Sequence, residues 1–400
     1  MKVVGVIQRY YPAVGGSENL AKNFLDYMSK NHTVTVYTTN AENIQSFWYN
    51  NSKTLSIDSG LNYNVVRNDF LIPTKIKYDQ LVKEFPFISS YPGPFSPKMW
   101  NDLVFKKFDC DLIYATSFPY DHIFPAYIAA KKWNIPIIIT PLIHQEFPEL
   151  YLTATKLTML NNADSIFVIS DSEKKVLVNK GVNEEKISII QPFINLVSEE
   201  KIKNDFRDKF SIGKNKIVLF VGSKSFVKGI IHLIEALTKV WQKKSDVILV
   251  VIGPTTEEFR KFYSKLPESI KKKIIDLGIT DEKTKKDAIS ECDLLALPSK
   301  SESFGLVYLE AWMYEKPVIG CNILPISDMI ENKKNGLLVE FGNINQLKDS
   351  ILELLDNPSL SQKYGKDGKN KALKLNSQDN LKSFEEKCLS VVDSFRNKKQ

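Results

Sequence analysis

The residues from Asp293 to Trp312 read DLLALPSKSESFGLVYLEAW. They begin with a short, continuously apolar run that ends at Pro298, as in a strand buried on both faces of a parallel sheet. A polar loop follows, and the chain then enters an apolar helix near Phe304. A buried strand that leads through a loop into a helix is the repeating unit of an α/β layered fold.

Similar patterns recur along most of the chain, so the predicted fold class is α/β. The other predicted strands cover residues 3–7, 34–37, 63–67, 111–115, 136–140, 165–169, 187–190, 217–221, 247–252, 317–321 and 336–339. Because the pattern restarts after a polar stretch near residues 192–214, we expect two doubly wound domains, over residues 1–195 and 196–377. Ligands bind such folds outside the carboxyl ends of the strands, so a cleft between the domains is the expected site.

The composition is that of a soluble globular protein. The chain has 400 residues, of which 43% are apolar and 25% are charged. Its net charge of +7, from 54 basic and 47 acidic residues, is weaker than a nucleic-acid-binding protein needs, but it suits an anionic substrate or an anionic membrane surface. Four widely spaced cysteines form neither a metal motif nor a disulfide framework, which predicts a reducing, cytoplasmic compartment. No apolar run approaches the roughly 20 residues of a membrane helix, so we expect a soluble or peripheral protein.

Two glutamates in the opening stretch are candidate ligand-binding groups. Glu302 lies in the polar loop, and Glu310 lies about a turn and a half into the helix. The amides at the helix start, from Gly305 to Val307, have no partner within the helix, and together with its dipole they favour a phosphate. Glu310 can accept hydrogen bonds from two vicinal hydroxyls, as a ribose offers. The plainer alternative, two surface glutamates, leaves a carboxylate unexplained in an otherwise apolar helix start.

Glycine-containing loops follow the first strand of each predicted domain. Gly15 and Gly16 open the first helix, where backbone amides can approach an anion, although the sequence is not the GxGxxG of a dinucleotide site. Lys228 and Gly229 take the corresponding place in the second domain, where a lysine can meet a phosphate as a point charge. The glycine pair alone is weak evidence, because such pairs often make tight turns, and Lys228 alone is more typical of an ordinary loop lysine.

His144 and the region of residues 40–100 are further candidates. His144 follows the predicted strand 136–140 at the edge of the expected cleft, where a histidine is either catalytic or structural. Residues 40–100 contain one predicted strand and many aromatic residues, so the region is either functional or a surface excursion packed on the sheet. Its aromatic and lysine-containing part, residues 70–100, is a candidate acceptor site or membrane contact.

The stretch from Pro298 onward resembles the signature of the retaining family 4 glycosyltransferases, also called glycosyl transferases group 1. The shared pattern is PSxSExFGLxxLEAxxxxxPVI, in which seven residues separate Glu302 from Glu310. Further similarities are YPAVGGSE at 11–18, NADSIFVIS at 162–170, the VG and KG of 221–229, and GLLV at 336–339. The resemblance implies the GT-B fold, with two Rossmann-like domains that face a central cleft. It places the acceptor on the first domain and the donor on the second, and a final helix, about residues 378–400, crosses back to the first domain.

The resemblance also assigns roles to residues. The catalytic residues would be Glu302, which contacts the transferred sugar, and His144. The nucleotide-sugar donor would be bound by Gly15, Gly16, Ser223, Lys224, Lys228, Ser303, Phe304, Gly305, Leu306, Val307 and Glu310. In this set Glu310 would hold the ribose, while Lys228 and the helix amides would hold the diphosphate without a metal or another cofactor. Ser223 stands where the family usually has an arginine, and we expect Lys224 to supply the missing positive charge.

These observations predict a metal-independent, hexosyltransferase-type glycosyltransferase. It would move a sugar, with retention at the anomeric carbon, from a nucleotide-diphosphate-sugar to a hydroxyl of a glycan, lipid-linked or small-molecule acceptor. Alternatives are an epimerase or phosphorylase of the same fold, and a non-catalytic nucleotide-sugar-binding protein, which the serine at position 223 favours. A glycosidase is disfavoured, because loop and helix direct the two glutamates to different parts of a ligand. We expect a cytoplasmic protein with no nucleic-acid partner, and a peripheral contact with the cytoplasmic membrane face is an option.

Overall fold

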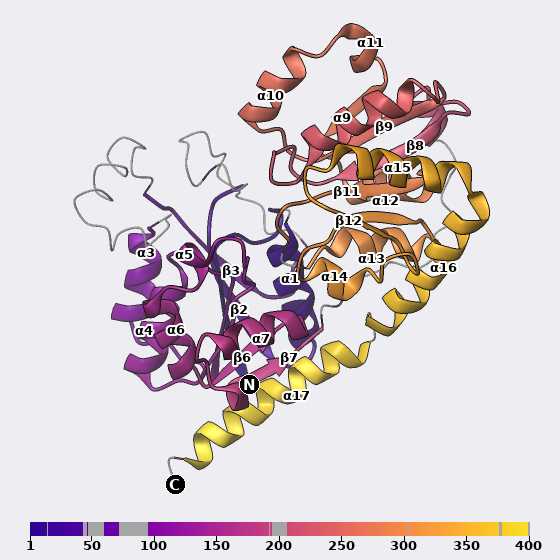
Figure 1. Cartoon of the computed structure of the whole chain (residues 1–400). Helices are drawn as coiled ribbons and strands as arrows, with labels where there is room; N and C mark the ends of the chain where they lie inside the picture. Colours follow the sequence, from indigo (N-terminus) through magenta and orange to yellow (C-terminus); the bar gives the residue numbers. More distant parts are fainter. Residues whose placement is uncertain are drawn as a thin grey trace. The chain divides into compact units, whose positions relative to one another are not determined.

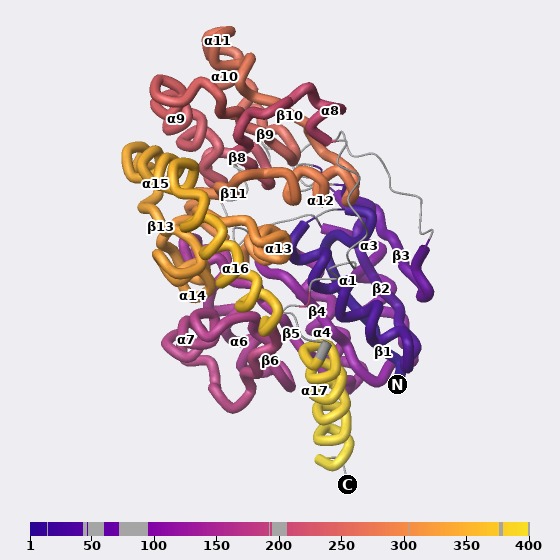
Figure 2. Tube along the Cα trace, turned by 90° about the vertical axis from the view of Figure 1, so that its right-hand side faces the viewer, coloured from indigo at the N-terminus to yellow at the C-terminus, as the bar shows by residue number. Residues whose placement is uncertain are grey.

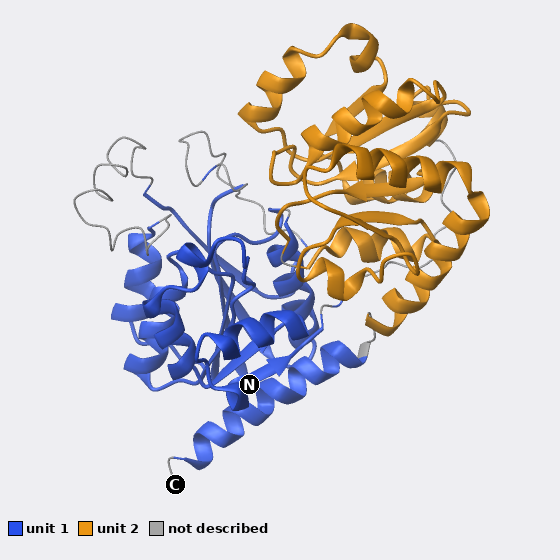
Figure 3. Cartoon of the chain, in the orientation of Figure 1, with its two compact units in different colours: residues 1–194, 376–400 blue, residues 195–375 orange. Residues whose placement is uncertain are grey.

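A computed structural model describes residues 1–13, 15–42, 46, 60–71, 95–191, 193, 206–302, 304–375 and 378–398. The chain divides into two compact units (Figure 3). The first unit comprises residues 1–194 together with 376–400, and the second comprises residues 195–375. Of the predicted acceptor or membrane segment at 70–100, residues 72–94 lie outside the described residues.

The first unit is built on a parallel seven-stranded sheet in the order β3-β2-β1-β4-β5-β6-β7. Its strands are β1 (Lys2–Ile7), β2 (Thr33–Thr39), β3 (Asn64–Asn68), β4 (Leu112–Thr116), β5 (Ile137–Thr140), β6 (Ser165–Val168) and β7 (Ile187–Ile189). The strand order reverses between β1 and β4, which makes this the topological switch point where doubly wound sheets bind ligands.

Helices cover both faces of this sheet, as Figure 1 shows. The helices of the unit are α1 (Gly16–Met28), α3 (Pro97–Trp100), the π-helix η3 (Asn101–Phe105), α4 (Ile123–Trp133), α5 (Pro148–Tyr151), α6 (Ala154–Asn162), α7 (Asp171–Asn179), the 3-10 helix η4 (Glu184–Lys186) and α17 (Gln378–Asn397). Alternate strand residues such as Ile113 and Ala115 join a buried cluster with residues of α4, η3 and α6. The intervening residues face the other way, and Phe384 of α17 packs there against Phe24, Tyr114 and Phe167. Both faces are therefore buried, as the continuous apolar strands predicted.

The second unit repeats the design with a parallel six-stranded sheet in the order β10-β9-β8-β11-β12-β13. Its strands are β8 (Lys216–Val221), β9 (Val247–Ile252), β10 (Ile274–Gly278), β11 (Leu294–Leu297), β12 (Val318–Cys321) and β13 (Leu337–Val339). The strand β10 was not among the predicted strands, because it follows three consecutive lysines at the edge of the sheet and only Ile274 in it is buried. The switch point of this sheet lies between β8 and β11.

The helices of the second unit flank its sheet (Figures 1 and 2). They are α8 (Phe206–Lys209), α9 (Ile230–Trp241), α10 (Glu257–Ser264), α11 (Glu268–Lys271), α12 (Glu282–Glu291), α13 (Leu306–Met313), α14 (Ile326–Met329), α15 (Ile344–Asp356) and α16 (Pro358–Leu375). The helix α9 is strongly amphipathic, and seven of its residues, from Ile230 to Trp241, are buried. None of the helices formed by the described residues combines the length and hydrophobicity that a membrane crossing requires.

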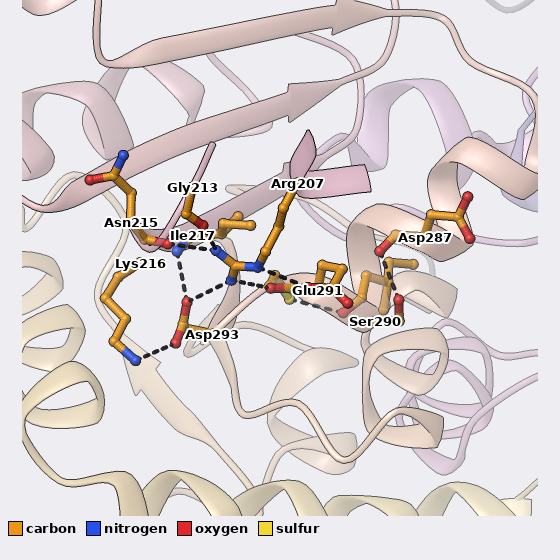
Figure 4. A network of polar contacts seen from close by, with 11 residues as sticks. Arg207, Gly213, Asn215, Lys216, Ile217, Asp287, Ser290, Glu291 and Asp293 are labelled. Carbon is orange, nitrogen blue, oxygen red and sulfur yellow. Dashed lines mark hydrogen bonds and ion pairs between the residues drawn. The ribbon is translucent and has the colours of Figure 1, made fainter. Parts of the chain in front are cut away.

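A charged network holds the amino ends of the central strands of the second sheet (Figure 4). Arg207 of α8 donates from Nε to Glu291 Oε2 at 2.8 Å, and its Nη2 lies 3.8 Å from Asp293 Oδ2. Asp293 directly precedes β11 and accepts a 2.8 Å hydrogen bond from the backbone amide of Ile217 in β8. This network stabilises the amino ends of the strands. The carboxyl ends, where doubly wound sheets bind ligands, are therefore the expected place of a ligand site.

Candidate active site

The loops that follow β8 and β11 meet at the switch point of the second sheet. The amide of Lys300 donates to the carbonyl oxygen of Val227 at 2.7 Å, which joins the two loops. Gly229 ends the first loop with φ 75°, and a Cβ at this position would overlap the carbonyl oxygen of Pro298. Glycine is therefore required both by the left-handed backbone and by the close approach of the second loop.

This junction brings together Lys228 and Glu302, two of the residues to which the family resemblance assigns roles in donor binding and catalysis. Lys228 Nζ lies 2.7 Å from Glu302 Oε1, and it also donates to the carbonyl oxygen of Ser301 at 3.3 Å. The Ser299 hydroxyl donates to the same Glu302 oxygen at 2.8 Å. The Lys228 side chain is 25% exposed and that of Glu302 is 10% exposed. The lysine is thus held by its partners but still reaches solvent.

The helix α13 begins directly beyond Glu302. Gly305 caps it with φ 78°, and Leu306 and Val307, which open the helix, are partly exposed. The first amides of a helix have no partner within it and carry the positive end of the dipole, so this end of α13 favours an anion. Phe304 is buried, and Ser303 lies outside the described residues.

Glu310 lies further along α13 and is paired with a lysine that the sequence analysis did not single out. Lys285 Nζ of α12 lies 3.1 Å from Glu310 Oε1. Burial raises the pKa of the Glu310 carboxyl above its ordinary value, and Lys285 opposes that rise. The pairing joins α12 and α13, which lie far enough apart in the sequence that no local pattern reveals it.

Lys224 is not available for the phosphate site that we expected it to share with Ser223. Ser223 Oγ lies 3.3 Å from Ser225 Oγ within the loop. Lys224 is 1% exposed, and its Nζ lies 2.5 Å from Asp276 Oδ1 of β10. Because neighbouring residues of an extended segment point to opposite sides, Lys224 turns away and its charge is committed to Asp276. The expectation that Lys224 compensates for the serine therefore does not agree with the structure.

In the first unit, the glycines that open α1 lie above a buried ion pair. Arg9 Nη2 lies 2.6 Å from Glu18 Oε1, and Ser17 Oγ donates to Glu18 Oε2 at 2.9 Å. A Cβ at Gly15 would overlap the Glu18 carboxylate, whereas a Cβ at Gly16 would meet open space. Arg9 and Glu18 were not predicted to have a role, although their opposite charges lie on either side of the glycine pair in the sequence.

The loop that carries His144 is held by a buried carboxylate. Glu173 of α7 accepts hydrogen bonds from the amides of Ile143 at 2.9 Å and Ile169 at 3.0 Å. Burial raises the pKa of Glu173 to about 7, although these backbone donors act in the opposite direction. The ring of His144 packs against that of Tyr151, with centroids 5.2 Å apart. Glu173 thus fixes the ends of two neighbouring strands and, with them, the base of the His144 loop.

Comparisons with known proteins agree with this architecture. Residues 14–197 match the family Glycosyltransferase Family 4, and residues 201–371 match the family Glycosyl transferases group 1. An uncharacterised 41.2 kDa protein in the cps region of Klebsiella pneumoniae is 24% identical over 84% of this chain and 86% of its own length. An uncharacterised glycosyltransferase of Methanocaldococcus jannaschii is 30% identical, over 47% of this chain and 54% of its own length.

A solved structure extends the likeness to the whole fold. The crystal structure of HepE from Anabaena, in complex with UDP and glucose, has a TM-score of 0.72 at 18% identity and covers 98% of this chain and 100% of HepE. The two sequence matches together span most of the chain, and both units have the parallel, doubly wound sheets of this structural class. The chain belongs to the family 4 glycosyltransferases, the glycosyl transferases group 1, and has their two-domain GT-B fold.

Proposed function

We propose that the protein is a retaining glycosyltransferase that takes a hexose from a nucleotide-diphosphate-sugar and transfers it to a hydroxyl acceptor. The observation that supports this most is the Lys228–Glu302 pair, which lies beside the amino end of α13 at the switch point of the second sheet. A cation, a helix amino end and a carboxylate within one pair of loops offer separate contacts for a diphosphate and for a sugar.

The reaction would break the bond between the anomeric carbon and the diphosphate oxygen. Negative charge then grows on the departing diphosphate, where Lys228 and the first amides of α13 stabilise it. The acceptor hydroxyl forms the new bond on the same face of the sugar and gives its proton to the departing phosphate oxygen. Glu302 would support the transferred sugar, Glu310 would hold the ribose, and His144 of the first unit would be a further catalytic residue. Because these groups neutralise the leaving charge, the proposal requires no metal.

The likenesses suggest which substrates to test first. HepE was crystallised with UDP and with glucose, so UDP-glucose and other UDP-hexoses are the first donors to test. Sugars and lipid-linked sugars are the first acceptors. The cytoplasmic location and the peripheral membrane contact stay predictions of the sequence.

Donor binding and turnover can be measured separately. A ligand that binds the native state raises the melting temperature, so a thermal-shift screen with UDP-, GDP- and ADP-sugars identifies the donor. We expect the donor that it identifies to release nucleoside diphosphate only when an acceptor is added, and proton NMR of the product to show an unchanged anomeric configuration. EDTA should leave the rate unchanged.

Each alternative function has its own result in the same experiment. A shift in melting temperature without any release of nucleotide, across a panel of acceptors, would indicate a binding protein. Transfer of the sugar to inorganic phosphate instead of a hydroxyl acceptor would indicate a phosphorylase. Conversion of the donor sugar to its epimer in the absence of an acceptor would indicate an epimerase. An inverted product would contradict the retaining mechanism, and a rate that EDTA abolishes and Mn²⁺ restores would contradict metal independence.

A further inference from the structure

Lys285 lies between two carboxylates, one on its own helix and one on the helix that carries the candidate ribose ligand. Its Nζ lies 3.0 Å from Glu282 Oε2 and 3.1 Å from Glu310 Oε1. The side chains of Lys285 and Glu310 are 14% and 18% exposed, so both are largely withdrawn from solvent but Glu310 stays accessible. Since α12 and α13 pack against each other, the contact does not depend on a mobile loop.

The surroundings of Glu310 make this lysine important for its charge. From α12, Lys285 and Lys286 favour the ionised carboxylate while Glu282 opposes it, and Tyr314, directly after α13, interacts electrostatically with Glu310. Burial raises the pKa of Glu310, and Lys285 is the largest influence that holds it down. Burial also acts to lower the pKa of Lys285, but Glu310 and Glu282 raise it above its ordinary value. The two groups therefore keep each other charged.

We propose that Lys285 is a positioning residue for the nucleotide, which holds one oxygen of Glu310 so that the rest of the ionised carboxylate can accept the two ribose hydroxyls. This inference rests on the proposed function, in which Glu310 binds the ribose. A carboxylate has two oxygens with about four acceptor sites, so one hydrogen bond to Lys285 leaves enough for both hydroxyls. A protonated carboxyl, in contrast, turns one of these sites into a donor.

Removal of Lys285 should therefore make nucleotide binding depend on pH. Without the lysine, Glu310 remains partly buried beside Glu282, and both conditions favour its protonated form. The carboxylate would then be lost at mildly acidic pH and regained at higher pH. A lysine with a merely structural role would lower the melting temperature without such a change.

The experiment measures the dissociation constant of UDP by calorimetry for the wild type, Lys285→Met, Lys285→Arg and Lys283→Met. Lys283 is the matched control, because it lies on the same helix but pairs with Asp287 instead. At about pH 6 we expect Lys285→Met to bind UDP about tenfold more weakly than the wild type, and at about pH 8.5 within about threefold of it. Lys285→Arg and Lys283→Met should follow the wild type. Because UDP itself titrates in this range, the dissociation constant of each variant is divided by that of the wild type at the same pH.

Glu310→Gln and 2′-deoxy-UDP separate a failure of this inference from a failure of the proposed function. If Glu310 binds the ribose, Glu310→Gln weakens UDP and removes its advantage over 2′-deoxy-UDP. If Glu310→Gln changes neither the affinity for UDP nor the preference for UDP over 2′-deoxy-UDP, Glu310 does not bind the ribose and the proposed function loses that contact. If Glu310→Gln has its effect but the affinity ratio of Lys285→Met is the same at both pH values, only the role of Lys285 is overturned. Tighter binding by Lys285→Met would also overturn it, since the lysine would then compete with the nucleotide.

Discussion

The two units each place a charged pair beside the switch point of their sheet, but the two pairs differ in their exposure to solvent. In the first unit, Arg9 follows β1 and pairs with Glu18 in the first turn of α1, where the side chains are 9% and 1% exposed. In the second unit, Lys228 and Glu302 are 25% and 10% exposed. The first pair is closed inside the protein, and the second still reaches the surface through its lysine.

This difference indicates that a glycine loop at a switch point does not by itself identify a ligand site. Glu18 fills the space beneath Gly15, so that loop is organised around a side chain of the protein. The loop of Gly229 packs instead against the backbone of Pro298, and the Lys228 side chain in this loop is 25% exposed. We therefore expect substitutions in the first pair to change stability and substitutions in the second to change catalysis.

The largest expected effect is the loss of stability in Arg9→Met. Removal of one member of a buried ion pair leaves the other charge without compensation, which costs about 3–5 kcal/mol. The melting temperature should fall by many degrees. Arg396→Met is the control, because Arg396 forms an ion pair with Asp111 in the same unit but is 60% exposed, and such pairs contribute little. Equal melting temperatures for the two variants would contradict the idea that the Arg9–Glu18 pair is buried from solvent and needed for stability.

The next effect is the loss of turnover in Glu302→Gln. A neutral amide cannot balance the charges of Lys228 and of the transition state, so turnover should fall by roughly a hundredfold or more, as on loss of a transition-state contact. The melting temperature should barely move, because the partner of Glu302, Lys228, is 25% exposed and the amide oxygen of glutamine can still accept the hydrogen bonds of Lys228 and Ser299. Glu340→Gln, at an exposed position in the same unit that contacts Asn322, should keep full activity. A folded Glu302→Gln enzyme with normal turnover would remove the central residue of the proposed site.

A third test concerns Glu173, another buried carboxylate of the first unit. Its folded-state pKa of about 7 is higher than the ordinary value, so between these values the folded chain holds a proton that the unfolded chain has released. Stability should therefore fall as the pH rises through this window, by about 3 kcal/mol for this one group.

Glu173→Gln isolates this contribution, because an amide does not titrate. We expect the melting temperature of the variant to improve relative to the wild type between about pH 5 and about pH 8. Parallel melting curves across that range would mean that the backbone amides of Ile143 and Ile169 keep Glu173 ionised throughout.

The sequence predicted more of the fold than of the site because the two depend on different ranges of contact. Strands buried on both faces of a parallel sheet are continuous runs of apolar residues, so all strands except β10 were predicted near their observed positions. The edge strand β10 has only one buried residue and therefore lacks such a run.

The pairing of side chains produces no comparable pattern in the sequence. The family pattern assigned Lys228 to the diphosphate and Glu302 to the sugar but did not predict that the two side chains pair. The partners of Lys224 and Glu310 lie 52 and 25 residues away in the sequence. Only the folded sheet and helices bring Asp276 and Lys285 to them. The direction in which a residue such as Lys224 points within a short loop was for the same reason not decided by the sequence.

The smallest expected effect lies in the loop after β8, where Ser223 is partly exposed and precedes Lys228 by five residues. An arginine there would present a planar fork to a diphosphate, and a hydrogen bond to a charged group is worth about 1.5 kcal/mol at the lower end of its range, which is about tenfold in affinity. We expect Ser223→Arg to tighten UDP binding by about that factor. Lys224→Met should lower the melting temperature, because Asp276 loses its partner, but should leave UDP affinity within about twofold. If Lys224→Met instead weakens UDP binding severalfold at an unchanged melting temperature, the Lys224 ammonium moves from Asp276 to the nucleotide when UDP binds. The ion pair of Lys224 would then break on ligand binding, whereas the Arg9–Glu18 pair of the first unit stays intact.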